Sequence, residues 1–455
     1  MSKPWTYFIN FVIINMGGDY MKKPIAIDLF CGAGGMSEGM LQAGFHIIYS
    51  NDISKDAMKT YIHRHEQLGL FHKKNTFESC KDIRELDAKE IFDSIAEIDE
   101  YKDRKKITID AIFGGPPCQG FSRAGLRNAE DPRNKLFKEY IRVINDVRPK
   151  YVVMENVEGF LDTVFEGFVG LDGEQYKKDK APSILINEFK KIGYNTIGPK
   201  LLNASDYGVP QNRKRMIFIA YLPSCVEPQF PIPFKTKKVT LKDAIYDLLN
   251  KEKISSFAND CIQGRTKTID GKNVEYDKSI ILNNEMSGHT KLISERFSLF
   301  NEGETTVDLR NRIQTSGIDL SGKEAIIHDL IRIYNVDEKE IIKKFKSKKL
   351  SIDDINNLLT KKGIRKRLKY DIPGPTMVTL PDDFIHPTEN RALTVREMAR
   401  VQSFDDSFEF LGKRTTGGPR RKVEVPQYTQ VGNAVPPLLA KAIASEIIKA
   451  LNEKK

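Results

Sequence analysis

The sequence predicts an α/β protein built on a doubly wound, Rossmann-like parallel sheet, with a smaller domain inserted into it. In the first half of the chain, short and wholly apolar segments alternate with amphipathic helical patterns. That alternation is typical of parallel strands that helices cover on both faces. After Tyr221 a proline-rich linker follows, and residues 235–390 are lysine-rich and polar without a regular alternation of strands and helices.

The apolar periodicity places the strands and helices of this sheet. Strands are predicted at residues 25–30, 45–50, 109–113, 151–154 and 216–221. A glycine-rich turn leads from the first strand into a helix that reaches Gln42, and a second helix covers 137–147 before Pro149. We expect a helical tract around 324–359, and a terminal helix at 439–448 whose broad apolar face packs back on the sheet.

These patterns divide the chain into a sheet domain, an insert and an extension. We expect the sheet domain at 21–228, completed by 429–455, and the inserted domain at 229–428. Residues 1–20 form an N-terminal extension whose apolar run, 7–15, is too short to span a bilayer and lacks the features of a signal peptide. Whether residues 1–20 are an optional extension or precede the true start is left open.

The composition excludes several classes of protein. With 455 residues, 40% of them hydrophobic, the chain is long enough for two or three domains and is neither disordered nor a membrane protein. The net charge of +10 permits a polyanionic partner without requiring one. The five cysteines are an odd number without a CxxC pair, which argues against a disulfide framework or a zinc site and for a reducing compartment.

Cys118 is the most informative single residue. It lies in the segment 114–122, GGPPCQGFS, directly after a predicted strand. The two prolines stiffen the backbone, and the glycines on both sides let a planar ligand approach the main chain. A thiol in this position indicates a nucleophile, although for an isolated cysteine a buried structural role is the simpler interpretation.

Two further features suggest a nucleotide-like ligand. The first strand ends in the turn Asp28–Gly35, DLFCGAGG, which exposes backbone N–H groups at the start of a helix. Ser37 occupies the position of the third glycine of the dinucleotide-binding motif, so a nicotinamide-dependent oxidoreductase is not favoured. Asp52 follows the second strand, where a carboxylate can bind a ribose hydroxyl pair. A tight structural turn would explain the glycines equally well.

Two polar segments lie next to later strands. Glu155-Asn156-Val157 follows the strand at 151–154, where Glu155 could serve as a general acid. Residues 211–215, QNRKR, precede the strand at 216–221, and Gln211, Arg213 and Arg215 point to one side of an extended segment. They could clamp an anionic or carbonyl-rich ligand. Taken singly, a helix cap and a solvated basic edge are the simpler interpretations.

Taken together, these segments closely resemble the DNA (cytosine-5)-methyltransferase family, in its bacterial restriction–modification type. The resemblance rests on DLFCGAGG, PPC, ENV, QxRxR, the block 391–400 and the segment GNAVPP at 432–437, in the family's order. It runs from Ile25 to Leu439 and is interrupted by a variable region. It implies an S-adenosylmethionine-dependent methyltransferase sheet with an inserted target-recognition domain.

The resemblance also implies the cofactor site. Phe30 would stack on the adenine of S-adenosylmethionine, the two glycines Gly32 and Gly34 would lie near its methionine part, and Asp52 would hold its ribose. Family members often have Glu at the position of Asp52. Asp82, followed by Ile83, would bind the adenine amino group. The complete implied set is Phe30, Gly32, Gly34, Asp52, Ile53, Asp82, Ile83, Pro116, Leu136 and Asn433.

The implied catalytic residues are Cys118, Glu155, Arg213 and Arg215. Cys118 would be the nucleophile, Glu155 would contact N3 and the amino edge of the base, Arg213 would contact O2, and Arg215 would support them. A thiolate that adds to C6 makes C5 nucleophilic enough to accept a methyl group. Glu155 then needs a pKa raised by burial, and the target nucleotide must be flipped out of the duplex.

Contacts to DNA are expected from basic runs in the variable region. We favour the basic runs at 365–369 and 413–422 for phosphate contacts, because nearby Gly and Pro residues suggest loops. A third run, at 343–349, is less favoured. Thr376 lies in a loose match to the family's base-reading segment. The residues predicted to contact DNA are Gln119, Ser122, Arg365, Arg367, Thr376, Arg420 and Arg421. No metal is expected, and His63, His65 and His72 are interpreted as surface residues.

The predicted function is methylation of C5 of a flipped-out cytosine within a specific double-stranded DNA sequence. The expected setting is a bacterial cytoplasmic monomer in a restriction–modification system, with a cognate restriction endonuclease as functional partner and no membrane contact. The alternative is a tRNA cytosine-5 methyltransferase with the DNA-type fold. That lineage departs from the segment Gly120-Phe121-Ser122 and has a shorter variable region, so DNA is favoured. A non-catalytic nucleic-acid-binding module is disfavoured by the intact set of Cys118, Glu155 and Arg213.

Overall fold

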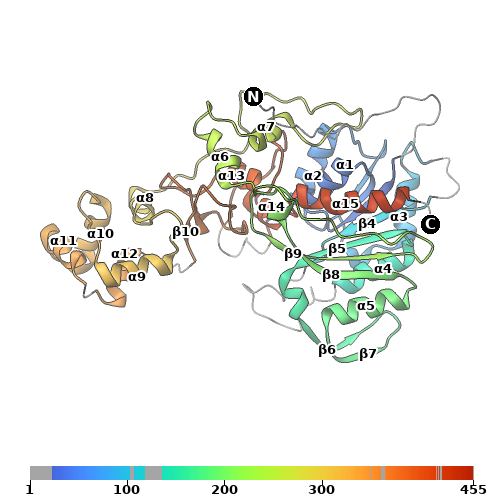
Figure 1. Cartoon of the computed structure of the whole chain (residues 1–455), viewed down its shortest axis with the longest axis horizontal. Helices are drawn as coiled ribbons and strands as arrows, with labels where there is room; N and C mark the ends of the chain where they lie inside the picture. Colours follow the sequence, from blue (N-terminus) through green and yellow to red (C-terminus); the bar gives the residue numbers. More distant parts are fainter. Residues whose placement is uncertain are drawn as a thin grey trace, which may run out of the picture.

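A seven-stranded sheet, in the order β3-β2-β1-β4-β5-β9-β8, forms the centre of the molecule (Figure 1). The computed structural model describes residues 23–102, 107–117, 136–348, 350–359, 364–416, 418, 420 and 423–453. The first five strands of that order run parallel, and β9 pairs antiparallel with both of its neighbours, β5 and β8. The strands are β1 Ile25–Leu29, β2 His46–Asn51, β3 Phe77–Ser79, β4 Ala111–Gly114, β5 Tyr151–Val157, β8 Asn195–Asn203 and β9 Lys214–Tyr221.

Helices cover both faces of the sheet, which confirms the doubly wound architecture. Ile25 and Ile27 of β1 enter one hydrophobic core together with α3, α4 and α5. Ala26 points the other way, into a second core that contains α1 and α15. Side chains of a strand alternate between faces, so a strand buried on both sides must be apolar throughout. The helices of this part are α1 Gly35–Ala43, α2 Lys55–Gln67, α3 Ala88–Ala96, α4 Leu136–Val147, α5 Ala181–Lys191 and α15 Pro437–Asn452.

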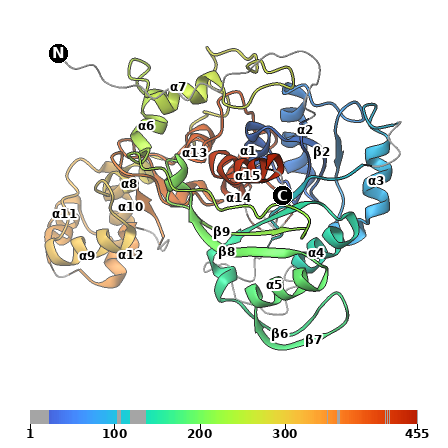
Figure 2. The same ribbon diagram turned by 45° about the vertical axis from the view of Figure 1, so that its right-hand side comes forward.

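The region between β9 and α15 contains a small helical lobe that lies to one side of the sheet (Figure 2). The helical lobe comprises residues 291–359 and has its own apolar core around Phe297, Leu309 and Phe345. Helices α6, α7, α13 and α14 form another core, which Ala33 of the β1–α1 turn joins. The helices are α6 Leu241–Ile245, α7 Ser256–Gln263, α8 Lys291–Ser298, α9 Thr306–Ser316, α10 Glu324–Tyr334, α11 Glu338–Lys346, α12 Ile352–Leu359, α13 Val395–Val401 and α14 Gln427–Asn433.

Short strands and 3-10 turns complete the fold. Two antiparallel strands make a hairpin beyond β5, and two parallel strands lie between the helical lobe and α13. These strands are β6 Val164–Val169, β7 Gln175–Lys180, β10 Lys366–Arg367 and β11 Phe384–Ile385. The turns are η1 Ile83–Glu85, η3 Glu158–Asp162, η4 Ala204–Tyr207, η5 Tyr246–Leu248 and η6 Pro381–Asp383. Within the described ranges, no helix has both the length and the hydropathy needed to cross a bilayer.

The five predicted strands are all present, but the prediction of a wholly parallel sheet is wrong at one edge. β9 pairs antiparallel with β5 and β8, and neither β8 nor β3 was predicted. β8 is mostly half-buried or exposed, and β3 has three residues, so neither carries a continuous apolar run. β5 is longer than predicted and continues to Val157, which places Glu155 within the strand.

Helices α1 and α15 pack with their backbones in close contact, and Gly39 makes this possible. A Cβ atom on Gly39 would lie 2.4 Å from both Ala440 Cβ and the Lys441 nitrogen. The C-terminal helix is therefore fitted against the helix that follows the first glycine turn. The predicted return of the terminal segment to the sheet is confirmed.

Substitution of Gly39 by Ala should destabilise the fold, although Ala is the better helix former by about 1 kcal/mol. The added methyl group meets rigid backbone, and overpacking of this kind costs about 1–3 kcal/mol. Gly288→Ala is a matched control because a Cβ there has no neighbour within 4 Å. Urea denaturation should give a lower midpoint for Gly39→Ala alone, and equal midpoints for the two variants would contradict the packing described.

Candidate active site

The turn after β1 is shaped to receive a ligand near its backbone. Phe30, Gly32 and Gly34 all have positive φ angles, of 59°, 55° and 102°. A Cβ on Gly32 would have no neighbour within 4 Å among the described residues, which leaves space beside its backbone. Gly34 is the N-cap of α1 and provides no side-chain cap. A planar or extended ligand can therefore approach main-chain groups at the carboxyl end of β1.

Asp52 lies beside this turn and is held by two backbone amides. Gly32 N–H donates to its Oδ2 at 2.9 Å, and Ser54 N–H donates to its Oδ1 at 2.7 Å. Burial raises the pKa of Asp52, and the two amide bonds partly offset this rise. Each carboxylate oxygen retains a free lone pair for a hydroxyl group. The neighbouring side chain of Ile53 is 65% exposed, which offers an apolar surface that a planar ring could cover.

The other residues predicted for the cofactor lie in varied surroundings. Asp82 caps η1, and its carboxylate forms an ion pair with Arg84, while Ile83 is buried. Pro116 is buried, and Leu136 begins α4 in a half-buried position. Asn433, at the end of α14, is exposed and lines a cavity with residues of the variable region. Asp52, by contrast, contacts the glycine turn directly through the hydrogen bond from Gly32.

Asp28, at the end of β1, is a fully buried carboxylate beneath the same turn. Its Oδ2 accepts a hydrogen bond of 2.5 Å from Ser37 Oγ, and its Oδ1 has no partner among the described residues. Ser37 in turn contacts Tyr61 OH at 2.9 Å. Burial raises the pKa of Asp28 to about 7, the Ser37 bond lowers it and the Asp52 charge raises it.

Glu155 and Arg215 form a partly enclosed ion pair where β5 meets β9. Glu155 is 9% exposed, and its Oε1 accepts a hydrogen bond of 2.7 Å from Arg215 Nε. The antiparallel register pairs Val157 with Arg215, so Glu155 and Arg215 are diagonal neighbours on one face. Burial raises the pKa of Glu155, whereas Arg215 and Arg213 lower it.

The segment that leads to Cys118 passes against Glu155. A Cβ on Gly115 would lie 3.1 Å from Glu155 Oε2, and Asn156 Nδ2 donates to the Pro116 carbonyl at 3.1 Å. Any side chain at 115 would therefore crowd the Glu155 carboxyl. The predicted residues Cys118, Gln119 and Ser122 lie outside the described residues. The backbone that carries them starts beside Glu155.

Arg213 binds two backbone carbonyls. Its guanidinium is buried and donates to the carbonyls of Met377 at 3.0 Å and Gly432 at 2.9 Å. Burial lowers the pKa of Arg213, as does the neighbouring Arg215. Arg215 is the arginine that contacts Glu155, in agreement with the supporting role expected for it. Alternation along the extended segment predicted that both side chains share a face but could not say which of them lies nearer to Glu155.

Two amide side chains with no predicted role of their own also shape the site. Asn156 holds the Pro116 carbonyl, as described above. Gln211 is fully buried, donates to Gln402 Oε1 at 2.8 Å and accepts from Met377 N–H at 2.7 Å. Thr376 Oγ1 donates to the Asn212 carbonyl at 2.9 Å. Asn156 lies in the motif ENV and Gln211 in QxRxR. A polar side chain inside a buried strand or turn must find a hydrogen-bond partner, so the sequence did offer a signal for both residues.

The prediction that Arg365 and Arg367 grip phosphates is contradicted. Arg367 is 5% exposed and donates to the carbonyls of Phe297, His386 and Glu389. Arg365 donates to the Asp382 carbonyl, and its guanidinium lies 5.0 Å from the centre of the Phe297 ring. Both side chains fasten β10 to its surroundings instead of facing solvent. Arg420 is exposed, and Arg421 lies outside the described residues.

The interpretation of His65 as a surface residue is also wrong. The centre of its ring lies 4.1 Å from that of Tyr61, with the two rings tilted by 42°, and its Nδ1 lies 3.7 Å from Glu78 Oε1. It is 2% exposed. His65 follows Tyr61 by one helical turn of α2, a spacing that could have indicated a shared buried face.

Comparisons with known proteins agree with this geometry. The family model described as C-5 cytosine-specific DNA methylase matches residues 25–449. The Type II methyltransferase M.DdeI of Desulfomicrobium norvegicum is 31% identical over 429 residues, covering 92% of this chain and 88% of its own length. The Type II methyltransferase M1.HphI of Haemophilus parahaemolyticus is 32% identical over 430 residues, covering 93% and 86%.

A solved structure shares the fold. It is of an E. coli protein described as a DNA modification methyltransferase encoded within a prophage, with a TM-score of 0.62 and 24% sequence identity. The match covers 94% of this chain and all of that one. The fold of the chain is therefore that of an S-adenosylmethionine-dependent methyltransferase.

Asp28 should make the stability of the fold depend on pH. Between about pH 4 and pH 7 the folded protein keeps the Asp28 proton that the unfolded chain releases, because the folded pKa is about 7 and the ordinary value is 3.8. Its contribution to stability therefore falls as pH rises through this window. Asp28→Asn removes this titration, so the variant should gain stability relative to the native chain, by up to roughly 4 kcal/mol at pH 8.

Urea unfolding at several pH values measures this difference. Other groups titrate alike in both proteins, so their contributions cancel in the comparison. If the free energies of unfolding of the variant and the native chain differ by the same amount from pH 4 to pH 8, the raised pKa of the buried Asp28 carboxyl is contradicted.

Proposed function

We propose that this chain, which belongs to the C-5 cytosine-specific DNA methylase family, methylates C5 of a cytosine flipped out of a specific double-stranded DNA sequence. Membership of that family makes it a DNA cytosine-5 methyltransferase. The flipped base, the covalent thiol chemistry and the biological role are proposals. One observation supports them above all: a buried carboxyl–guanidinium pair lies beside the backbone that leads to Cys118.

The proposed nucleophile is the thiolate of Cys118. Its sulfur forms a bond to C6 of the cytosine, and the electrons of the C5–C6 double bond move into the ring as N3 takes a proton from Glu155. C5 is then nucleophilic enough to accept a methyl group. Loss of the C5 proton to a water molecule and return of the N3 proton to Glu155 restore the C5–C6 double bond, and the sulfur leaves C6 as a thiolate. The thiol is thereby released for another cycle.

Glu155 is suited to hold the proton that this route needs. Its burial favours the neutral carboxyl, which can donate to N3. Arg215 keeps the side chain in place through its Nε and retains further N–H donors. We propose that Arg215, in place of Arg213, contacts O2 of the base, where negative charge develops during thiol addition. Arg213 instead holds the carbonyls of Met377 and Gly432.

The residues around the first glycine turn fit S-adenosylmethionine. Asp52 would hold the ribose, Ile53 and Phe30 would flank the adenine, and Gly32 leaves space for the methionine part. When bound, the cofactor supplies the methyl group. Asp82 would have to share its carboxylate between Arg84 and the adenine amino group. We assign the same pocket to Ile83, Pro116, Leu136 and Asn433.

The proposed biological role is protection of host DNA within a restriction–modification system. The relatives M.DdeI and M1.HphI are both named Type II methyltransferases, and each aligns with more than nine-tenths of this chain. A target base inside a duplex must leave the stack before a thiol can reach C6, at a cost of roughly a few kcal/mol. Bisulfite sequencing of DNA from cells that express the chain would reveal the modified base and its sequence context together. Unmodified DNA would refute the role.

Cys118 should form a trappable bond with its substrate. DNA with 5-fluorocytosine at the target position, given together with S-adenosylmethionine, should yield a covalent complex that survives denaturing electrophoresis. The fluorine cannot leave as a proton does, so the sulfur stays attached to C6. Cys118→Ala should give neither the complex nor methylation. A native enzyme that methylates ordinary DNA without being trapped would rule out thiol addition.

The proposed exchange of roles between the two arginines predicts opposite phenotypes. Arg215→Gln should lower kcat by roughly 10²–10³, the cost of losing one donor to a developing anion. Arg213→Gln leaves two buried carbonyls short of a donor, so it should lower the free energy of unfolding by about 2–4 kcal/mol. Single-turnover methylation and urea unfolding of both variants separate the effects. Loss of activity confined to an otherwise stable Arg213→Gln would restore the original assignment.

A further inference from the structure

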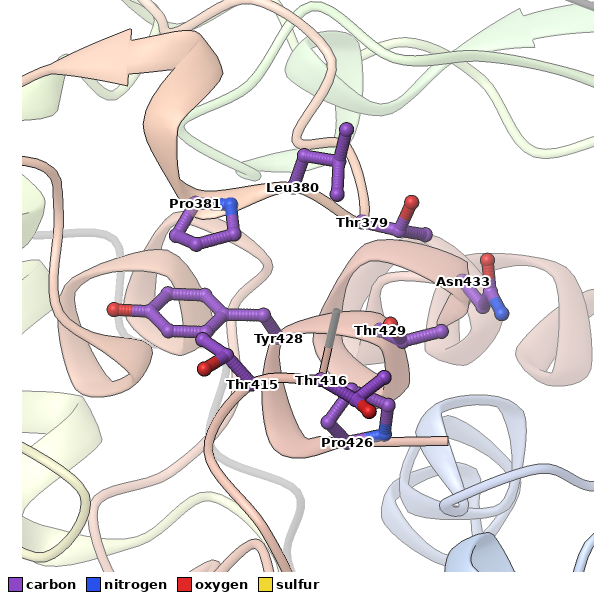
Figure 3. Close-up of a pocket in the computed structure, with 9 residues that line it drawn as sticks. All are labelled: Thr379, Leu380, Pro381, Thr415, Thr416, Pro426, Tyr428, Thr429 and Asn433. Atoms are coloured by element: carbon purple, nitrogen blue, oxygen red, sulfur yellow. The ribbon is translucent and has the colours of Figure 1, made fainter. Parts of the chain in front are cut away.

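A cavity lined by hydroxyl groups lies next to the proposed active site. Its volume is about 180 Å³, and it is formed between residues 379–381, residues 415–416 and helix α14 (Figure 3). Side chains of Thr379, Thr415 and Thr429 and the amide of Asn433 contribute to its lining. None of these four has a hydrogen-bond partner among the described residues, whereas Thr416 donates to Glu424. Asn433 is assigned above to the cofactor, so the three threonines are the uncommitted polar groups of the cavity.

The cavity is built on the same contacts that fix the catalytic arginines. Arg213 binds the carbonyls of Met377 and Gly432. These two carbonyls lie close in sequence to Thr379 and Asn433, on two of the cavity walls. A Cβ on Gly432 would come within 2.7 Å of the Val378 carbonyl, so the two walls touch. Arg213 also lowers the pKa of Glu155, so the cavity walls and the proposed catalytic carboxyl share one arginine.

The third wall belongs to a basic loop docked on the first turn of α14. Gln427 N–H donates to the Lys413 carbonyl at 2.9 Å, which presents the following threonines to the cavity. Lys413 forms an ion pair with Glu424 at 2.8 Å and is neutralised there. Arg414 uses one nitrogen for the carbonyls of Glu285 and Met286, and its other donors have no hydrogen-bond partner among the described residues.

Positive charge is thus left on the loop that supplies Thr415 and Thr416 to the cavity. Arg420, on the same loop, is exposed and contributes to lowering the pKa of Glu424. Hydroxyl and amide donors with arginines nearby suit a phosphate, which accepts several hydrogen bonds and carries one negative charge. The paired Glu424 is the acidic side chain of the loop itself, and its charge is offset by Lys413.

We propose that this cavity binds a backbone phosphate of the DNA strand next to the flipped cytosine, a role that rests on the proposed function. Thr415 and Thr429 donate to the phosphate from two walls, and Arg414 and Arg420 supply the surrounding positive charge. The contact fixes the flipped strand relative to Glu155 and Arg215. It carries no sequence information, since phosphates are common to all sequences.

Binding to DNA with single methylphosphonates tests this site. The duplex carries the sequence found by bisulfite sequencing, with one phosphate at a time made neutral. For the native chain, one position beside the target cytosine should weaken binding by roughly tenfold. In Thr415→Val/Thr429→Val, binding to unmodified DNA should be weaker by a similar factor, and the same methylphosphonate should cause no further loss. The single variant Thr415→Val, at an exposed residue, should show a smaller change in the same direction.

Thr196→Val, on β8, removes a hydroxyl away from the cavity and should match the native chain at every position. An identical methylphosphonate profile for the double variant and the native chain would overturn the proposal. A raised KM for S-adenosylmethionine with a native phosphate profile would also overturn it, and would assign the cavity to the cofactor carboxylate. A native chain that methylates no DNA would remove the proposed function, and the phosphate site with it.

Discussion

The proposed chemistry of this molecule depends on the protonation of one carboxyl group, that of Glu155, which burial and a neighbouring arginine influence in opposite directions. Glu155 lies on a central strand, where burial favours its neutral form, yet Arg215 contacts it at 2.7 Å and favours the charged form. Neither influence alone would suit a group that must hold a proton and then share it with a base. The guanidinium fixes the position of the carboxyl, and burial keeps the proton affinity high.

The antiparallel edge of the sheet makes this arrangement possible. β9 runs opposite to β5, so its first residues arrive at the carboxyl end of the parallel strands, where the glycine turn and the segment before Cys118 also lie. Along the same stretch, Gln211 and Arg213 bind residues of the variable region, and Arg215 binds Glu155. The proposed catalytic chemistry and the attachment of the variable region therefore both depend on residues 211–215.

The sequence predicted the fold wherever apolar runs were long, as at β1, β2, β4, β5 and β9, and it predicted the family from ordered motifs. It could not predict β8, whose side chains are mostly half-buried or exposed, or the orientation of β9, because periodicity carries no strand direction. It also misplaced Arg365 and Arg367. A basic run looks the same whether its guanidinium groups face solvent or bind carbonyls, and the buried acceptors come from residues distant in sequence.

The most direct test of this balance is the pKa of Glu155 itself. Carboxyl ¹³C resonances of glutamate-labelled protein, with the Glu155 signal assigned by its absence in Glu155→Gln, can be followed as a function of pH. The midpoint of the Glu155 titration should lie above the ordinary pKa of 4.5, because burial raises this pKa more than the two arginines lower it. A midpoint at or below 4.5 would show that Arg215 keeps the carboxyl charged, and Glu155 could not then be the proton donor to the base.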